Sequence, residues 1–392
     1  MDIVCHHCGA LHWAQEAIKN STAQLPCFGM CCNHGQVRLP PAVDPPYALQ
    51  QLLSGETPQS QEFRENIRQY NAALAFTSLG VAIDESINNG RGPYVFWIHG
   101  ELCHRIGSLL PAEGRSPAYA QLYIYDPRAV LDQRMQRNSN LRRDTMELLQ
   151  HMLERHHFYA GIYKHAHEIL SEHDGVEDIS INLRVDNSRD RRRYNLPTAE
   201  ELAVILPGNG AQPSESRDIV LRQRDGPLRR VHDGHPAYAP LHYVLLFPHG
   251  EDGWSWELRQ HVSAGQQPRR LSQTRFYAYC IQHRENTFPT ILRGGRLFQQ
   301  YLVDMWASAD QNRLNYLLKN QNQIRASLYS GLEDAIATAD GVIDLNELGQ
   351  RIILPSSYIG GPRHMQQLYQ DSMAVGRYYK KVDLFITMTA NP

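Results

Sequence analysis

The cysteines constrain the fold of this 392-residue chain more than any other feature, because five of the seven lie within the first 32 residues. A segment of this size is too small to bury a stable apolar core of its own, so it needs a cross-link. The N-terminus, MDIVCHHC, has neither the basic flank nor the apolar stretch of a signal peptide. We therefore expect an intracellular protein, in which clustered cysteines indicate a metal site rather than disulfides.

The spacing of these cysteines favours one structural zinc ion. Cys5-His-His-Cys8 leaves the two-residue gap that lets two thiolates chelate zinc from a tight turn. The second half of the site follows about 20 residues later and has three candidates, Cys27, Cys31 and Cys32. Two histidines compete for the fourth position, His12 and His34. Because this many thiolates leave no open position for water, we expect a structural site rather than a catalytic one.

The charge of the chain restricts how it can contact nucleic acid. A net charge of −2 excludes a protein that coats DNA with its whole surface, so contacts must be local. Two arginine-rich stretches, residues 189–193 and 269–296, provide such patches, and the second interleaves its arginines with aromatic rings. The candidate DNA-binding residues are Arg191, Arg192, Arg193, Arg269, Arg270, Arg275, Tyr277, Tyr279, Arg293 and Arg296. The alternative is that the arginines form a solvated face and that the tyrosines belong to a helix core.

Hydrophobic periodicity predicts an α+β fold in four parts. Residues 1–44 form the zinc-finger-like module, which ends in a proline-rich stretch. Residues 45–126 and 127–260 form a mixed leader, and 271–392 form a C-terminal domain after a linker at 259–271. The predicted helices of the leader cover 49–53, 63–74, 146–153 and 158–169. Its predicted strands are 79–83, 94–98, 121–125, 179–185, 204–206, 219–221 and 243–247.

The C-terminal domain carries the strongest helical signal. Apolar residues at helical spacing run from Leu297 to Leu318, and a further helix is predicted from Arg363 to Tyr379 after a proline suited to a first turn. The alternation from Val382 to Thr389 predicts a strand. No apolar run reaches the length of about 18 residues that a membrane-spanning helix requires, so we expect no membrane association.

The sequence favours neither a catalytic metal site built from histidines nor an ATP-driven motor. A second metal set could be built from four histidines, which are His232, His235, His242 and His249. Their spacings do not place them on one helix face and prolines interrupt the segment, so turn histidines are the favoured interpretation. The glycine-rich phosphate loop of an ATP-driven motor does not occur in the sequence.

A chain of ordered motifs resembles one family. The segments GGRLFQQYLVDMW (294–306), ILPSSYIGGPRH (353–364) and DLFIT (383–387) are similar, in this order, to the N-terminal helicase-like domain of Helitrons, which are rolling-circle DNA transposons. Upstream, CHHCGALHW (5–13), CCNHGQV (31–37) and HPAYAPLHY (235–243) resemble the leader of the replicase-helicase proteins of this family.

The resemblance implies a nuclear protein that engages DNA, either transposon ends or single strands. In the family, the leader precedes a nuclease that cuts one strand through a tyrosine and a metal held by a His-x-His motif, followed by a helicase. Residues 385–387 match the first nuclease motif, and the catalytic motifs normally lie beyond residue 392. The resemblance therefore implies an α+β chain whose helical segment leads into the first strand of a truncated nuclease sheet.

The same resemblance selects among the ligands and the functions. Cys27 lies outside the family pattern, which favours Cys5, Cys8, Cys31 and Cys32 as the zinc ligands. We expect a DNA-engaging part of a Helitron transposition protein that is truncated before its active sites and inactive alone. The alternatives are a metal-dependent DNA-nicking enzyme that uses the region from His232 to His249, or an inactive transposon relic.

Overall fold

The computed structural model describes residues 1–18, 26–79, 103–108, 111, 114–164, 179–183, 203–207, 219–222, 229–262, 265, 267–285, 287–321 and 354–380. The chain divides into two compact units. Unit 1 comprises Met1–Asp84 and Phe96–Trp306, and unit 2 comprises Glu85–Val95 and Ala307–Pro392. The predicted strands at 94–98 and 382–389, and the arginines 191–193, lie outside the described residues. The described part is rich in helices with small sheets, as an α+β fold requires.

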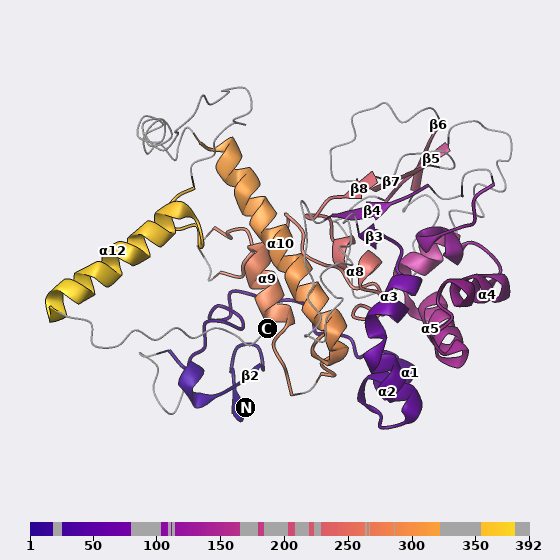
Figure 1. The fold of residues 1–392 in the computed structure, drawn as a ribbon, viewed down its shortest axis with the longest axis horizontal. Coiled ribbons are helices and arrows are strands. Elements are labelled where there is room, and N and C mark those ends of the chain that lie inside the picture. Colours follow the sequence, from indigo (N-terminus) through magenta and orange to yellow (C-terminus); the bar gives the residue numbers. More distant parts are fainter. Residues whose placement is uncertain are drawn as a thin grey trace. The chain divides into compact units, whose positions relative to one another are not determined.

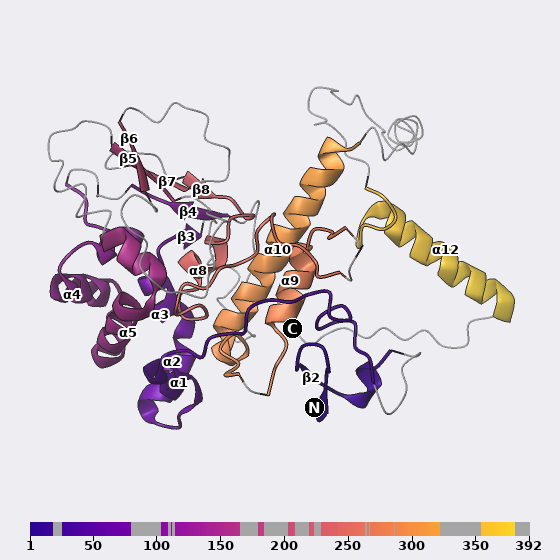
Figure 2. The same cartoon turned by 180° about the vertical axis from the view of Figure 1, so that it is seen from behind.

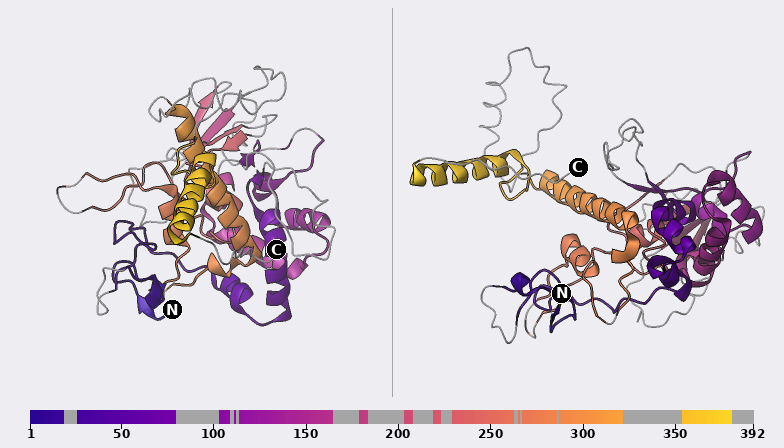
Figure 3. Two further views of the ribbon diagram at one scale, coloured as in Figure 1. Left: turned by 60° about the vertical axis from the view of Figure 1, so that its left-hand side comes forward. Right: turned by 60° about the horizontal axis from the view of Figure 1, so that its bottom comes forward.

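Five helices gather on one side of unit 1 (Figures 1 and 3). Local sequence explains where two of them begin. Thr57 caps the helix at 58–65 by accepting a hydrogen bond from the Ser60 N–H, and Asp126 caps the helix at 127–137 ahead of Pro127. The predicted helix at 63–74 is broken at Asn66, and the fourth helix was not predicted. The helices are α1 Tyr47–Ser54, α2 Pro58–Glu65, α3 Ile67–Leu74, α4 Pro127–Arg137 and α5 Arg143–His156. Residues 158–164 are also helical.

Two small antiparallel sheets complete the leader. The first has the order β3-β4-β8 and the second β6-β5-β7 (Figure 1). In the second sheet, Ile181 pairs with Ile205 on one side and with Leu221 on the other, so the predicted strands at 179–185, 204–206 and 219–221 are confirmed. The strands are β3 Ser78–Leu79, β4 His104–Ile106, β5 Ile179–Leu183, β6 Ala203–Pro207, β7 Ile219–Arg222 and β8 Arg229–Val231.

Two predicted strands are wrong. Residues 121–125 fall largely in a 3-10 helix, Tyr119–Tyr123, where Leu122 and Tyr123 are both buried although consecutive residues of a strand point to opposite faces. Residues 243–247 form turns after the short helix α8 Tyr238–His242, and all five are buried. A short apolar run is compatible with any buried segment, so its periodicity could not identify a strand.

Two further helices follow, α9 Gln273–Cys280 and α10 Arg296–Lys319, and α9 together with α10 as far as Trp306 belongs to unit 1 (Figures 1 and 2). The predicted long helix from 297 to 318 is confirmed. Its residues Leu297, Tyr301 and Met305 are buried, and the Tyr301 ring meets the Tyr277 ring of α9 edge-on at 6.1 Å. The segment predicted as a linker, 259–271, folds back through an antiparallel bridge between Arg259 and Arg270.

A buried polar network joins α10 to the leader. Asp304 lies 2.6 Å from His104 Nε2 and accepts hydrogen bonds from the hydroxyls of Tyr243 at 2.7 Å and Tyr238 at 3.1 Å. Burial opposes ionisation of this carboxyl, but the nearby His104 and the hydrogen bonds outweigh it and lower the pKa of Asp304. Residue 304 and residue 104 therefore belong to one core, which was not predicted from the sequence.

Acid should destabilise this core through its buried histidines. Burial lowers the pKa of His242 to about 3, whereas an unfolded histidine titrates near 6.5. Between these values the unfolded state binds the extra proton, so the free energy of unfolding falls as the pH decreases from about 6.5 towards 3 by up to about 1.4 kcal/mol per unit. Urea unfolding of wild type and His242→Gln across pH 4–7 isolates this contribution, since both carry the same other groups. Equal pH slopes in the two proteins would contradict it.

In unit 2 the described residues are 307–321 and 354–380, which include the end of α10 and the helix α12 Pro362–Tyr379. The predicted helix from 363 to 379 is confirmed. Tyr358 donates a hydrogen bond of 2.6 Å to Asp310, and the Arg313 guanidinium lies 5.4 Å from the centre of the same ring. None of the helices in the described ranges is long and apolar enough to cross a membrane.

Candidate metal centre and the surrounding surface

The N-terminal module begins with a short hairpin. Its strands, β1 Ile3–Val4 and β2 Leu11–His12, pair antiparallel and present the Cys5–Cys8 turn at their end. The Gly9 N–H donates to the Cys5 carbonyl at 2.8 Å, and Gly9 adopts a φ of +72°, which disfavours any residue with a Cβ. The hairpin thus fixes the first two sulfurs on one turn.

The second turn carries Cys31 and Cys32. The Gly35 N–H donates a hydrogen bond of 3.2 Å to the Cys32 sulfur, and the Val37 N–H donates to the Cys32 carbonyl at 2.9 Å. Gly35 has a φ of +78°, and a Cβ there would lie 3.0 Å from the His7 ring of the first turn. Close approach of the two turns therefore depends on glycine at this position.

The four sulfur atoms converge and could hold a metal ion. All lie within 4.8 Å of one another, and Cys32 Sγ lies 3.8 Å from both Cys5 Sγ and Cys31 Sγ. A tetrahedral zinc site with Zn–S bonds of about 2.3 Å places its sulfurs about 3.8 Å apart, whereas a disulfide needs about 2.05 Å. Among the described residues, this is the one group of three or more potential ligands with such spacing.

Electrostatics in the cluster also fits a bound cation. Burial, followed by the neighbouring sulfurs of Cys8 and Cys5, raises the pKa of Cys32 to about 12. Hydrogen bonds with the thiols of Cys31 and Cys8 lower the pKa of Cys5, and hydrogen bonds with Cys5 and Cys8 raise the pKa of Cys31. Four thiolates so close together repel one another, and one divalent cation would offset that repulsion.

The three competing ligands lie outside this group. Cys27 is half-buried and its carbonyl accepts a hydrogen bond from the Ile18 N–H. His12 is buried, with Nδ1 at 2.5 Å from Glu16 and its ring stacked on Phe28 at 4.0 Å. His34 is exposed. The structure therefore brings together the four cysteines that the family pattern favoured.

Arg284 anchors the first cysteine turn to the segment after α9. Its Nε donates to the Cys8 carbonyl at 3.1 Å, and its guanidinium lies 3.8 Å from the centre of the Tyr279 ring. Ala10 forms an antiparallel bridge with Arg284, and the Leu11 N–H donates to the His283 carbonyl at 2.9 Å. Arg284 thus has a structural role in holding the first cysteine turn, which the sequence did not indicate.

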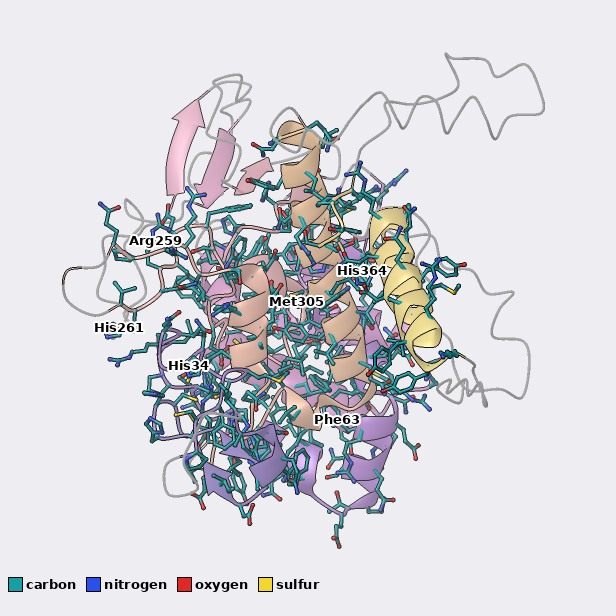
Figure 4. The ribbon with its side chains drawn as sticks, turned by 90° about the vertical axis from the view of Figure 1, so that its left-hand side faces the viewer. His34, Phe63, Arg259, His261, Met305 and His364 are labelled. Carbon is teal, nitrogen blue, oxygen red and sulfur yellow. The ribbon has the colours of Figure 1, made fainter. Side chains whose placement is uncertain are left out.

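The second cysteine turn contacts the 259–270 loop. The His261 N–H donates a hydrogen bond of 2.7 Å to the Gln36 carbonyl, and the labelled side chains of His34, His261 and Arg259 lie on the same side of the molecule (Figure 4). Arg269 and Arg270 are exposed on the same loop, and Arg275 is exposed on α9. The second cysteine turn and the loop that carries Arg269 and Arg270 are therefore joined by a backbone hydrogen bond.

The other predicted DNA-binding residues that the structure describes differ in their exposure. Arg293 and Arg296 are exposed, with the Arg293 guanidinium 5.3 Å from the centre of the Phe288 ring. Tyr277 is only 8% exposed and its hydroxyl accepts a hydrogen bond from Gln273. It is therefore a core residue of a helix, which was the alternative to DNA binding. Tyr279 is half-buried beneath Arg284.

The four histidines between residues 232 and 249 do not gather into a ligand set in the described part of the chain. His242 Nδ1 faces Thr77, His249 Nε2 bonds to the Asp44 carbonyl, and His232 Nδ1 accepts from the Gly234 N–H. His235 Nδ1 accepts from the Ala237 N–H. Each ring bonds to a different neighbour, so this geometry gives no support to the alternative of a nicking enzyme built on this region.

Comparison with known families agrees with the motifs. Residues 276–392 match the family model described as the Helitron helicase-like domain at the N-terminus. No curated protein sequence matches the chain. The matched segment begins within α9 and includes α10 and α12, so it starts inside the core of unit 1. The C-terminal part of the chain, residues 276–392, thus carries a Helitron helicase-like N-terminal domain.

Proposed function

We propose that this chain is the DNA-engaging part of a Helitron transposition protein, in which a structural zinc ion supports a surface that binds single-stranded DNA in the nucleus. The match of residues 276–392 to the Helitron helicase-like domain is the observation that carries the proposal. Proteins of a rolling-circle transposon handle a displaced strand, so single-stranded DNA is the expected partner.

The cysteine cluster supports the zinc part of the proposal. Cys5, Cys8, Cys31 and Cys32 supply four sulfurs at the spacing of a tetrahedral zinc site. The zinc ion would supply the free energy that a module of this size cannot obtain from an apolar core. With four thiolate ligands, the ion would stabilise the fold and leave no position for a reacting water.

Exposed arginines support the DNA part. Arg269 and Arg270 lie on the loop that bonds to the second cysteine turn, and Arg275 lies near the start of α9. The chain as a whole is slightly acidic, so a long-range field does not attract phosphate and binding must use such local contacts. The zinc ion would hold this loop in place through the bond between His261 and Gln36.

Replacing Arg269, Arg270 and Arg275 together with glutamine should weaken binding to single-stranded DNA. Each lost phosphate contact removes a released counterion, so the slope of log K against log salt should flatten by about 2 for three contacts on a single strand. Fluorescence anisotropy with a labelled oligo(dT) at several salt concentrations measures both quantities.

A matched control removes the same charge elsewhere. Arg128, Arg143 and Arg155 are exposed on α4 and α5, and their replacement with glutamine should leave the salt slope close to that of wild type. If both triple variants behave alike, the arginines near α9 form a solvated face and the proposed surface is wrong.

A further inference from the structure

One stripe of α10 is exposed where the helix packs into unit 1. Between residues 296 and 306 the exposed side chains are Arg296, Gln299, Val303 and Trp306. Their spacing of three, four and three residues places them along one face of the helix over about 15 Å. The opposite face carries Leu297, Tyr301 and Met305, which are all buried.

Trp306 is the unusual member of this stripe. Trp306 is 60% exposed, and Val303, one turn before it, is 44% exposed. Every other apolar side chain between residues 296 and 306 is buried or half-buried. Core packing of the described residues does not account for a tryptophan on the solvent side. A large flat ring exposed beside polar groups is the arrangement used to stack on a base.

The charge of the stripe indicates what it binds. The one acidic residue in these three turns is Asp304, which is buried and bonded to His104 and Tyr243. Arg296 is exposed at the start of the stripe, and the exposed Arg293 precedes it by one turn. The stripe is therefore cationic at one end and aromatic at the other, which matches a strand with anionic phosphates and stacking bases.

We propose that the stripe from Arg296 to Trp306 is a stacking platform for single-stranded DNA. Trp306 stacks on a base, Arg296 contacts a phosphate, and Val303 and Gln299 contact the strand between them. This inference rests on the proposed function and adds a stacking residue to it. The bases of a duplex are paired and stacked on one another, so the platform selects single strands.

The test compares Trp306→Ala with Trp13→Ala in the full chain. Trp13 is 53% exposed in the N-terminal module and serves as a control of the same residue type. Loss of one stacked base should weaken oligo(dT) binding roughly 5- to 100-fold in Trp306→Ala, with an unchanged salt slope and unchanged affinity for duplex DNA. Trp306→Phe should retain most of the affinity, and Arg296→Gln should flatten the slope by about 0.7.

Several outcomes separate this inference from the proposed function. If wild type binds oligo(dT) and Trp306→Ala binds equally well, the platform is wrong while the proposed function stands. If wild type does not bind single strands, both are wrong. If Trp306→Ala retains its affinity but converts a dimer to a monomer in light scattering, the stripe is an interface between copies. Circular dichroism of each variant must match wild type, as an exposed site predicts.

Discussion

Replacing Cys5 with serine should abolish zinc retention and unfold the N-terminal module. Cys5 is buried and its sulfur lies 3.8 Å from that of Cys32, so serine leaves three thiolates around an ion that needs four ligands. Structural zinc contributes about 10–16 kcal/mol to small modules, which makes this the largest effect expected for one substitution. Metal analysis after gel filtration measures the bound zinc, and limited proteolysis measures exposure of the first 40 residues.

Cys27→Ser provides the matched control. Cys27 lies in the same module but outside the group of four sulfurs, so this variant should keep one zinc ion per chain and resist proteolysis as wild type does. Equal zinc loss in the two variants would assign Cys27 to the site. Full zinc retention by Cys5→Ser would rule out the ligand set.

Replacing Asp304 with alanine should destabilise unit 1 by about 3–5 kcal/mol, because removal of one partner leaves a buried histidine and two tyrosine hydroxyls without their acceptor. His104, Tyr238 and Tyr243 all bond to this carboxylate in the core. Urea unfolding followed by circular dichroism gives the change in the free energy of unfolding.

An exposed carboxylate supplies the comparison. Asp132 pairs with Arg143 on the surface, and its replacement with alanine should cost less than about 1 kcal/mol. A change of similar size for Asp304→Ala and Asp132→Ala would mean that the network does not join α10 to the leader. The lowered pKa of Asp304 adds a second signature, because its contribution to stability is present above the unfolded pKa near 4 and is lost as the pH falls below it.

Much of the local structure was predictable because its signals lie close together in the sequence. The gap between Cys5 and Cys8 predicted a chelating turn, and the periodicity from 297 to 318 predicted α10. Family motifs predicted the Helitron helicase-like domain that the comparison confirms. The choice of Cys31 and Cys32 over Cys27 came from those motifs, and the converging sulfurs agree with it.

Contacts between distant residues could not be predicted from one sequence. The bond between His104 and Asp304 spans 200 residues, and nothing in either neighbourhood identifies the other partner. The bond between Arg284 and the Cys8 carbonyl spans 276 residues, and neither segment of the sequence indicates the other. The run from Tyr243 to Phe247 resembled a strand because burial on all sides removes the periodicity that distinguishes strands from turns.

The first residues of the matched family domain fold as part of the leader. The match begins at residue 276, yet α9 and the first turns of α10 are part of the core of unit 1. Tyr277 and Tyr301 meet there, and Asp304 bonds to residues far upstream. The leader and the start of the Helitron helicase-like domain therefore fold together, which is why experiments on the proposed surface need the full chain.

X-ray absorption spectroscopy at the zinc edge, combined with metal analysis of the purified chain, tests the zinc centre most directly. We expect one zinc ion per chain with four sulfur ligands at about 2.3 Å. A shell with a nitrogen ligand would assign His12 or His34 to the site in place of a cysteine. A chain that carries no metal, and whose N-terminal module resists proteolysis in the presence of a chelator, would rule out a structural zinc site.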